Sequence, residues 1–389
     1  MIARSLPLVL SLAACAPPRP SVPTTPQIPP AQLSALATGV SWLPYERASF
    51  ERAARENKLI LLSGKASWCH FCHVMDDETY ARPEVVRLIA QSFIPIRVDI
   101  DARPDIGERY GAWGWPATIV LDARGEELGK YRGYIRAEDF VGLLEEARDR
   151  TGPLAPNRLT AAATRAASLA ELPFAVAGAV ARLDSFYDDE LGGWGMRQKA
   201  PIGEALELEA RRAARGDERA SRRVAQTVAA QRALIDPVWG GIYQYSVGGT
   251  WKEPHFEKLA TYQAANLEAY ATAFEQSRDP AVASDSHAIA RYIRERLSSA
   301  DGRAFVSEDA DVRSPEGRTI LVGARFYALG SAERLAIGAP RRDENHYPYE
   351  ASILAVALLR HATATGDEAA RARARVILAR TLSEFEKEG

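Results

Sequence analysis

The stretch LLSGKASWCHFCH, residues 61–73, places the pair Cys69 and Cys72 directly after an apolar run. The run Leu59–Leu62 is short and unbroken, as expected of a buried central strand. A helix that opens at Cys69 would put this thiol at a helix N-terminus, where partial positive charge lowers its pKa and makes it a nucleophile. Cys72 lies one turn later, near enough to resolve a mixed disulfide. The stretch therefore predicts a redox-active disulfide in which Cys69 attacks and Cys72 resolves.

The neighbours of the pair indicate how it would work. His70 lies between the cysteines, and when protonated it favours the Cys69 thiolate, which makes the oxidised pair easier to reduce. Trp115-Pro116 comes later, at the start of another predicted strand. In thioredoxin folds a cis-proline faces the cysteine pair and the residue before it binds the substrate backbone. We expect a cis Trp115–Pro116 bond held by tertiary contacts, with Trp68, Trp115 and Pro116 docking the substrate.

Two other interpretations of the pair stay open from sequence. Cys69-His70-Phe71-Cys72-His73 also matches C-x-x-C-H, the pattern for covalent haem c, with His73 as axial ligand. Haem would not explain the preceding strand or the later Trp-Pro. Structural zinc at the cysteines would need a second ligand pair at matching spacing, which the sequence lacks. We therefore expect no metal and no cofactor beyond the disulfide itself.

Strand-like and helix-like patterns alternate through residues 38–152. They predict helices at 47–56, 83–90 and 137–148, and strands at 59–62, 93–98, 117–121 and 128–131. The order α-β-α-β-α-β-β-α predicts a mixed sheet flanked by helices, which is an α/β thioredoxin-like domain.

The first residues indicate export. Residues 1–15 contain a short apolar stretch that ends in Leu-Ala-Ala-Cys, which resembles a bacterial lipoprotein signal with Cys15 as the lipid acceptor. The alternative is an ordinary secretory signal in which Cys15 is incidental. Ala16 stands where an aspartate would favour inner-membrane retention, so we expect a lipid-anchored envelope protein at the outer membrane, facing the periplasm. Residues 16–37 are proline-rich and predict an extended linker.

Composition narrows the class of protein. The formal net charge of −2 does not suggest a nucleic-acid binder. No run of about 18 apolar residues exists, so we expect membrane attachment through the lipid alone. Three cysteines are too few for a disulfide-stapled scaffold, and if Cys15 is lipidated the free thiols are Cys69 and Cys72.

Residues 153–389 have the pattern of helix hairpins. Two loops match in the form D-x-x-x-G-G-hydrophobic, Asp188–Trp194 and Asp236–Ile242. Three turns end in an aspartate placed to cap the next helix, namely Asp217, Asp279 and Asp367. Repeated helix pairs joined by like loops predict an all-α array or toroid.

Several of these segments together resemble one family. They are Cys69–Met75, Phe93–Asp99, Arg103–Ile106, Gly114–Pro116, Tyr187–Trp194, Lys199–Pro201, Gly240–Tyr243, Trp251–Lys258 and Ser307–Asp311. The combination is similar to the spermatogenesis-associated protein 20-like family of thioredoxin-domain proteins. The resemblance implies a thioredoxin-like domain joined to a helical toroid like those of six-hairpin glycosidases and N-acylglucosamine 2-epimerases. We expect this chain to depart from the family in a lipoprotein leader and in a shorter, incomplete α/α toroid-like domain.

The helical domain offers a candidate ligand site of its own. Aromatic residues in or near the loops of one face could stack on sugar rings, a histidine and a glutamate could act as base and acid, and a carboxylate pair could cleave a glycosidic bond. Ligand or partner binding without catalysis, and a pure scaffold, are the alternatives, because fold analogy does not establish function. The candidates are Trp194, Tyr243, Trp251, His255, Glu257, Glu308, Asp309 and Asp311.

Together these patterns predict an exported thiol–disulfide oxidoreductase. We expect it to act on protein thiols or disulfides and to exchange electrons with an unknown redox partner. The alternative is a carbohydrate-binding or carbohydrate-modifying α/α toroid protein with an accessory thioredoxin module, and a third class is an envelope interaction protein.

Overall fold

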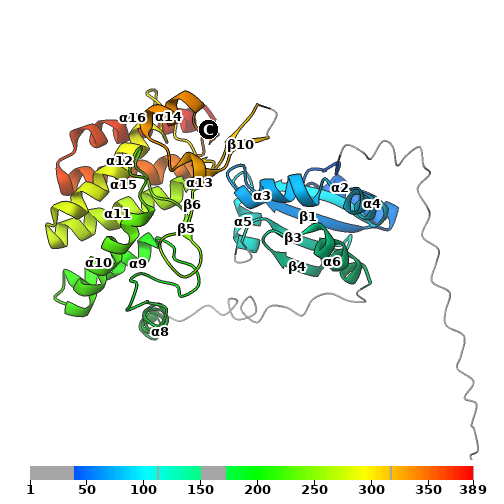
Figure 1. Cartoon of the computed structure of the whole chain (residues 1–389), viewed down its shortest axis with the longest axis horizontal. Coiled ribbons are helices and arrows are strands. Elements are labelled where there is room, and N and C mark those ends of the chain that lie inside the picture. The colour runs from blue at the N-terminus through cyan, green and yellow to red at the C-terminus, as the bar shows by residue number, and fades with distance from the viewer. Residues whose placement is uncertain (1–38, 112–113, 150–171, 316–317, 389) are drawn as a thin grey trace, which may run out of the picture.

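The computed structural model describes residues 39–111, 114–149, 172–315 and 318–388. The predicted signal peptide with Cys15, the predicted linker and the predicted domain boundary between residues 152 and 153 lie outside the described residues. Figure 1 shows the thioredoxin-like domain on the right, with α3 at the end that faces the helical domain.

The N-terminal domain contains the predicted helices and strands, with ends shifted by a few residues. Its elements are α2 (Arg47–Glu56), β1 (Leu59–Lys65), α3 (His70–Val74), the π-helical turn η2 (Met75–Thr79), α4 (Pro83–Ser92), β2 (Phe93–Asp99), α5 (Pro104–Tyr110), β3 (Ala117–Leu121), β4 (Glu127–Arg132) and α6 (Ala137–Asp149).

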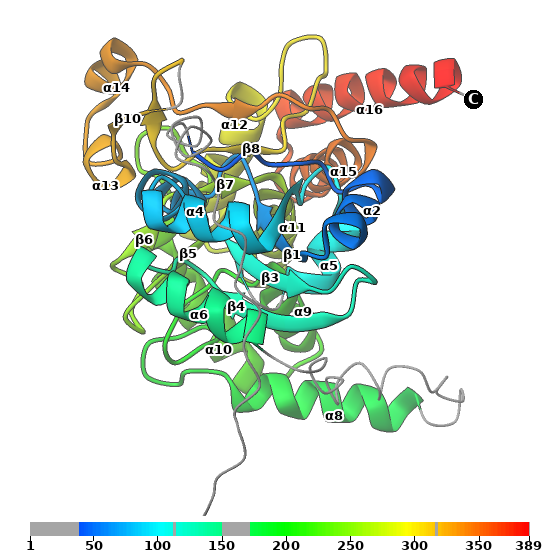
Figure 2. The ribbon, with the colours of Figure 1, turned by 90° about the vertical axis from the view of Figure 1, so that its right-hand side faces the viewer.

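The four strands form one mixed sheet in the order β2-β1-β3-β4. Strand β1 is parallel to β2 and antiparallel to β3, so it is a central strand, as its unbroken apolar sequence predicts. Leu61 packs with Phe140 of α6 on one face, and Leu62 packs with Ile106 of α5 on the other. Both faces are therefore covered by helices, as Figure 2 shows from the side of this domain. The chain leaves β1 at Lys65 and turns into α3, which carries the cysteines.

The C-terminal domain consists of helices joined by loops and short strands. Its helices are α8 (Leu172–Ser185), α9 (Gly203–Ala213), α10 (Glu218–Gln231), the 3-10 turn η4 (Arg232–Leu234), α11 (Ala260–Ser277), α12 (Pro280–Glu295), α13 (Gly323–Phe326), α14 (Ser331–Ile337), α15 (Pro348–Thr365) and α16 (Glu368–Glu388). Its strands are β5 (Tyr245–Ser246), β6 (Pro254–His255), β7 (Lys258–Leu259), β8 (Ser307–Glu308), β9 (Val312–Arg313), β10 (Thr319–Leu321) and β11 (Arg342–Asp343).

The long helices pack as hairpins in two layers. Helix α9 pairs with α10, α11 with α12, and α15 with α16, while α11 also packs against α9 and α15. The inner layer is thus α9, α11 and α15, and the outer layer is α10, α12 and α16. This is an arc of an α/α toroid-like domain, as the sequence predicts. The predicted aspartate caps are confirmed, since Asp217, Asp279 and Asp367 accept from backbone amides of the next helix. Within the described ranges, no helix has both the length and the apolar character to cross a bilayer.

The two matching loops fold alike around a buried lysine. Lys199 Nζ donates to Asp188 Oδ2 at 2.6 Å and to the carbonyl of the first glycine in that loop. Lys258 Nζ does the same in the second loop, at 2.8 Å from Asp236 Oδ2. Both glycines of each loop have φ between +71° and +78°, a conformation that favours glycine. The repeat seen in the sequence is therefore a repeated ion-pair loop, and Asp236 is further bound by Arg334.

Replacing Lys199 by methionine should destabilise the helical domain. The lysine is fully buried, so the substitution keeps the side-chain volume but leaves the Asp188 charge without its cation. Loss of one member of a buried pair costs about 3 kcal/mol. Urea unfolding followed by circular dichroism measures this, with the exposed Lys252→Met as control. Equal midpoints for the two variants would contradict the role assigned to the pair.

Candidate redox site

Cys69 and Cys72 form a disulfide at the start of α3. Cys69 is the residue that precedes the helix, its backbone is extended, and its Sγ accepts from the Cys72 amide at 3.2 Å. The predicted pairing and the predicted position at a helix start are thus confirmed. Both side chains are buried, with 4% of Cys69 and 2% of Cys72 exposed.

The Trp115–Pro116 peptide bond is cis, as the sequence predicts. Trp115 packs into the apolar cluster that contains the two cysteines. Its ring also lies against Gly64 of β1, where a Cβ atom would stand 2.6 Å from a ring carbon. Sequence reasoning missed Gly64, although a glycine inside an apolar strand is a signal of close approach.

Trp68 is anchored by a carboxylate that sequence reasoning also missed. Its Nε1 donates to Asp101 Oδ2 at 2.8 Å. Burial, followed by the nearby charge of Asp99, raises the pKa of Asp101 to about 7. A buried aspartate that follows a strand in the sequence gives little local signal of such a contact.

His70, between the cysteines, and His73, directly after them, both contact aspartates of the helical domain. His70 Nδ1 donates to Asp311 Oδ2 at 2.5 Å, and this hydrogen bond raises the pKa of His70 above its ordinary 6.5. Although burial opposes it, the same contact lowers the pKa of Asp311. His73 Nε2 donates to the Ser67 carbonyl at 2.9 Å and lies 3.3 Å from Asp309 Oδ2. These aspartates, expected to serve sugar chemistry, lie instead at the redox site.

Glu257 is the third acidic residue that reaches α3 from the helical domain. Its Oε1 accepts from the backbone amide of His70 at 3.3 Å. Its side chain is buried, and Oε2 has no hydrogen-bond partner among the described residues. His255 Nδ1 lies 3.8 Å from this oxygen. The ring of His255 stacks on Tyr245, and its centroid lies 5.5 Å from that of Phe71 in α3, so His255 too faces α3.

Several clefts between the domains border α3 among the described residues, two large ones and a smaller one of about 360 Å³ beside His70 and Asp311. The first, of about 840 Å³, is lined by Cys69, Trp68 and Trp115 from one domain and by Tyr245 and Glu257, among others, from the other. The disulfide therefore opens into a space that both domains enclose.

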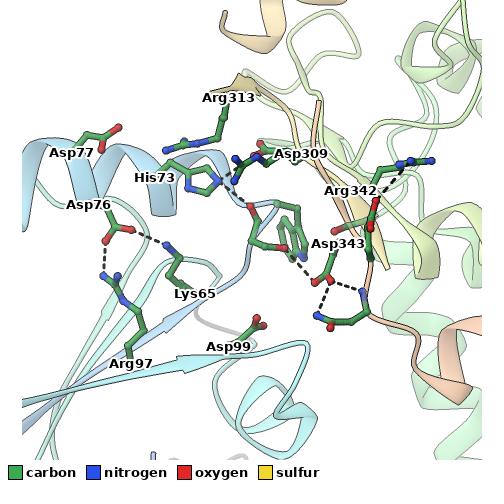
Figure 3. Close-up of a pocket in the computed structure, with 16 residues that line it drawn as sticks. Lys65, His73, Asp76, Asp77, Arg97, Asp99, Asp309, Arg313, Arg342 and Asp343 are labelled. Carbon is green, nitrogen blue, oxygen red and sulfur yellow. Dashed lines mark hydrogen bonds and ion pairs between the residues drawn. The ribbon is translucent and has the colours of Figure 1, made fainter. Parts of the chain in front are cut away.

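The second cleft, of about 720 Å³, lies on the His73 side and is shown in Figure 3. Its charges are largely paired across short distances. Asp76 binds Lys65 at 2.7 Å and also binds Arg97, while the Ser67 hydroxyl donates to Asp343 at 3.3 Å. Figure 3 shows His73 beside Asp309 at the edge of this cleft. Of these contacts, Ser67–Asp343 and His73–Asp309 join the two domains, whereas Lys65, Asp76 and Arg97 all belong to the thioredoxin-like domain.

The structure does not gather the eight candidate ligand-site residues into one site. Trp194, Tyr243 and Trp251 belong to the buried core of the helical domain, so the expectation that they offer an open aromatic face to a sugar is wrong for this conformation. Glu308 is also buried, and Arg296 binds it at 2.7 Å. The other four, His255, Glu257, Asp309 and Asp311, lie beside α3.

One further group of side chains could hold a metal ion. Among the described residues, His287, His361 and Asp367 bring one ligand atom each within 4.8 Å of one another. His361 is buried, its Nδ1 lies 2.7 Å from the Ser286 hydroxyl, and burial lowers its pKa to about 4. This group lies on α12, α15 and the turn after α15, and none of its members lines the clefts at α3.

Comparison with known proteins places this architecture among relatives. A family model for Thioredox_DsbH, a protein of unknown function (DUF255), matches residues 30–142. Human spermatogenesis-associated protein 20 is 29% identical over 324 residues, which are 74% of this chain and 41% of the human protein. The chain is a homologue of spermatogenesis-associated protein 20. The resemblance inferred from sequence is confirmed, and the chain spans less than half the length of these spermatogenesis-associated relatives.

Other similarities cover one domain each. The thiol:disulfide interchange protein DsbD 2 of Pseudomonas aeruginosa is 29% identical over 104 residues, which are 25% of this chain and 18% of that protein. A sugar epimerase structure from a ruminal bacterium aligns with 51% of this chain and 50% of its own, at 16% identity and a TM-score of 0.37. The first of these similarities and the Cys69–Cys72 disulfide identify a thiol–disulfide oxidoreductase-like module beside the helical domain of this spermatogenesis-associated protein 20 homologue.

Replacing Asp311 by asparagine should change how stability depends on pH. Because the pKa of His70 is raised in the folded state, its pairing with Asp311 contributes fully below pH 6.5 and is lost as pH rises through the raised value. Because the pKa of Asp311 is lowered, the same contribution is lost when pH falls through that lowered value, below its ordinary 3.8. The wild type should therefore exceed Asp311→Asn in stability most between about pH 4 and pH 6.5.

Urea unfolding across pH 3 to 9 measures this difference. The exposed Asp189→Asn is the matched control, and its difference from the wild type should stay flat. A flat difference for Asp311→Asn as well would argue against the His70–Asp311 pair.

Proposed function

We propose that this protein is an exported thiol–disulfide oxidoreductase with Cys69 as nucleophile and Cys72 as resolving thiol. The observation that carries the proposal is the Cys69–Cys72 disulfide at the start of α3, beside a cis Trp115–Pro116 bond and facing a cleft. Sequence similarity to an interchange protein over the same domain supports the same chemistry. The disulfide is the redox group of this proposal, and the chemistry needs no other cofactor.

The reaction proceeds through two successive thiol–disulfide exchange steps. The Cys69 thiolate attacks one sulfur of a substrate disulfide, forms a mixed disulfide and releases the first substrate thiolate. Cys72 then gives up its proton and attacks Cys69 Sγ, which releases the second substrate thiolate and forms the Cys69–Cys72 bond. Two electrons pass from the cysteine pair to the substrate, the thiolates take protons from Cys72 and from solvent, and the reverse sequence oxidises a dithiol. Protein thiols and disulfides are the substrate class expected from sequence.

His70 supports the first transfer through its charge. Its pairing with Asp311 raises the pKa of His70, so a larger fraction of the imidazole is protonated at neutral pH. A cation beside Cys69 stabilises the thiolate, which is the attacking species. The helical domain therefore contributes to the reactivity of the pair through Asp311, which acts on His70 and not on the sulfur atoms.

Replacing each cysteine by serine should separate the two roles. In a Cys15→Ser background, the reduced protein releases two thiols from an added small disulfide. Cys69→Ser should release none above background, because the nucleophile is missing. Cys72→Ser should release one thiol and retain the other as a mixed disulfide visible by mass spectrometry. Undiminished thiol release by Cys69→Ser, or no adduct on Cys72→Ser, would contradict these roles.

The proposal includes attachment to the outer membrane through Cys15. It is supported by the Leu-Ala-Ala-Cys sequence at residues 12–15. In a Gram-negative host, the wild-type chain should fractionate with membranes and carry a diacylglyceryl mass, whereas Cys15→Ala should not. Recovery of both proteins in the soluble fraction without lipid would contradict this part of the proposal.

A further inference from the structure

Both domains line the cleft that the disulfide faces, and their side chains bury both cysteines. We propose that the cleft takes a small disulfide, of the size of a paired amino acid or short peptide, that presents an N–H group to Glu257. This inference rests on the proposed function and narrows its substrate class from protein disulfides to small ones.

The first argument is the burial of the disulfide by the other domain. The apolar cluster that contains Cys69 and Cys72 also contains Leu259 of β7, and Tyr262 of α11 packs against it. With 4% of Cys69 and 2% of Cys72 exposed, the sulfur atoms are covered except where the cleft reaches them. A disulfide on the surface of a folded protein would have to bring its own backbone and neighbours past these side chains.

The second argument is the size and lining of the cleft. Its volume of about 840 Å³ falls within the roughly 300–1,000 Å³ of small-molecule sites. Trp68, Phe71 and Trp115 line one wall from the thioredoxin-like domain. Tyr245 and Tyr262 line the other wall from the helical domain. Aromatic walls of this kind bury the apolar parts of a ligand and leave its orientation to a few polar groups.

The third argument is the carboxylate of Glu257. Only 3% of this residue is exposed, and it lines the same cleft as Cys69. Oε1 accepts from the His70 amide, while Oε2 has no hydrogen-bond partner in the described part of the chain and lies 3.8 Å from His255 Nδ1. A buried polar atom without a partner calls for an explanation, and a bound ligand is one. An ammonium or amide N–H of a ligand bound beside Cys69 would donate the hydrogen bond that Oε2 lacks.

The charge of the cleft agrees with such a ligand. Two acidic residues line the cleft, the buried Glu257 and the half-buried Asp101, whereas the lining residue Arg132 is exposed. An ammonium-bearing disulfide therefore meets a carboxylate near the sulfur atoms, while a dicarboxylate disulfide meets like charge there. Charge-assisted hydrogen bonds are the stronger ones, so the preference should be measurable.

A panel of three disulfides tests the inference. Cystamine carries two ammonium groups, 3,3′-dithiodipropionate is a small dicarboxylate with no N–H, and insulin carries its disulfides on a folded protein. With the full chain bearing Cys15→Ser, the rate of exchange with each disulfide is measured in both directions. Each rate is divided by the rate at which free dithiothreitol exchanges with the same disulfide. We expect the protein to prefer cystamine over dithiodipropionate by about tenfold or more and to react with insulin more slowly than with cystamine.

Two glutamate variants test whether Glu257 causes the preference for cystamine. Glu257→Gln should lose the cystamine preference through a raised KM, while the exposed Glu253→Gln, in the same loop region, should keep it. Tyr262→Ala should widen the cleft and raise the relative rate with insulin. Retention of the full preference by Glu257→Gln would overturn the role of this carboxylate.

The outcomes also separate this inference from the proposed function. Reaction with insulin at least as fast as with cystamine, on the normalised scale, would overturn the inference and leave the oxidoreductase assignment intact. Failure to exchange with any of the three disulfides, in either direction, would overturn the oxidoreductase assignment itself.

Discussion

The helix that follows Cys69 is held, through its two histidines, by acidic residues of the helical domain. Asp311 binds His70 and Asp309 lies beside His73, although these partners are more than 230 residues apart in sequence. Each aspartate is buried in this contact, and a buried carboxylate deprived of its partner is costly, so the pairs favour the docked arrangement. The docking of the two domains at these contacts buries the disulfide, places Glu257 beside α3 and forms the clefts between the domains.

Much of the thioredoxin-like domain could be predicted from sequence because its signals are local. The apolar run of β1, the proline that opens α4 and the Trp115-Pro116 pair each report on their own neighbourhood. Such signals define strands, helix starts and turns without knowledge of distant residues. The disulfide followed in the same way, since its cysteines are one helical turn apart.

The rest of the site could not be predicted from local patterns in the sequence. Asp309, Asp311 and Glu257 carry no mark of proximity to α3, and their acidity suggested sugar chemistry in the helical domain. Trp194 and Trp251 lie near polar, glycine-rich loops, which suggested exposure, whereas they are core residues of the helical domain. Contacts between segments far apart in the chain depend on how the domains dock. The periodicity of apolar residues along a strand or a helix does not contain that information.

The lysine-centred loops have a consequence for how the helical domain is assembled. In each loop the negative charge of the aspartate is neutralised by a lysine that follows within about two dozen residues, at the entry to the next segment. In the first loop, charge balance is therefore achieved within the loop and the segment that follows it, whereas in the second loop Asp236 is shared with the distant Arg334. A unit like the first can be added or removed without leaving an unpaired charge in the core of the domain. The first loop is in this sense a self-contained unit, whereas the second loop also depends on Arg334 of α14, which ties it to a distant part of the helical domain.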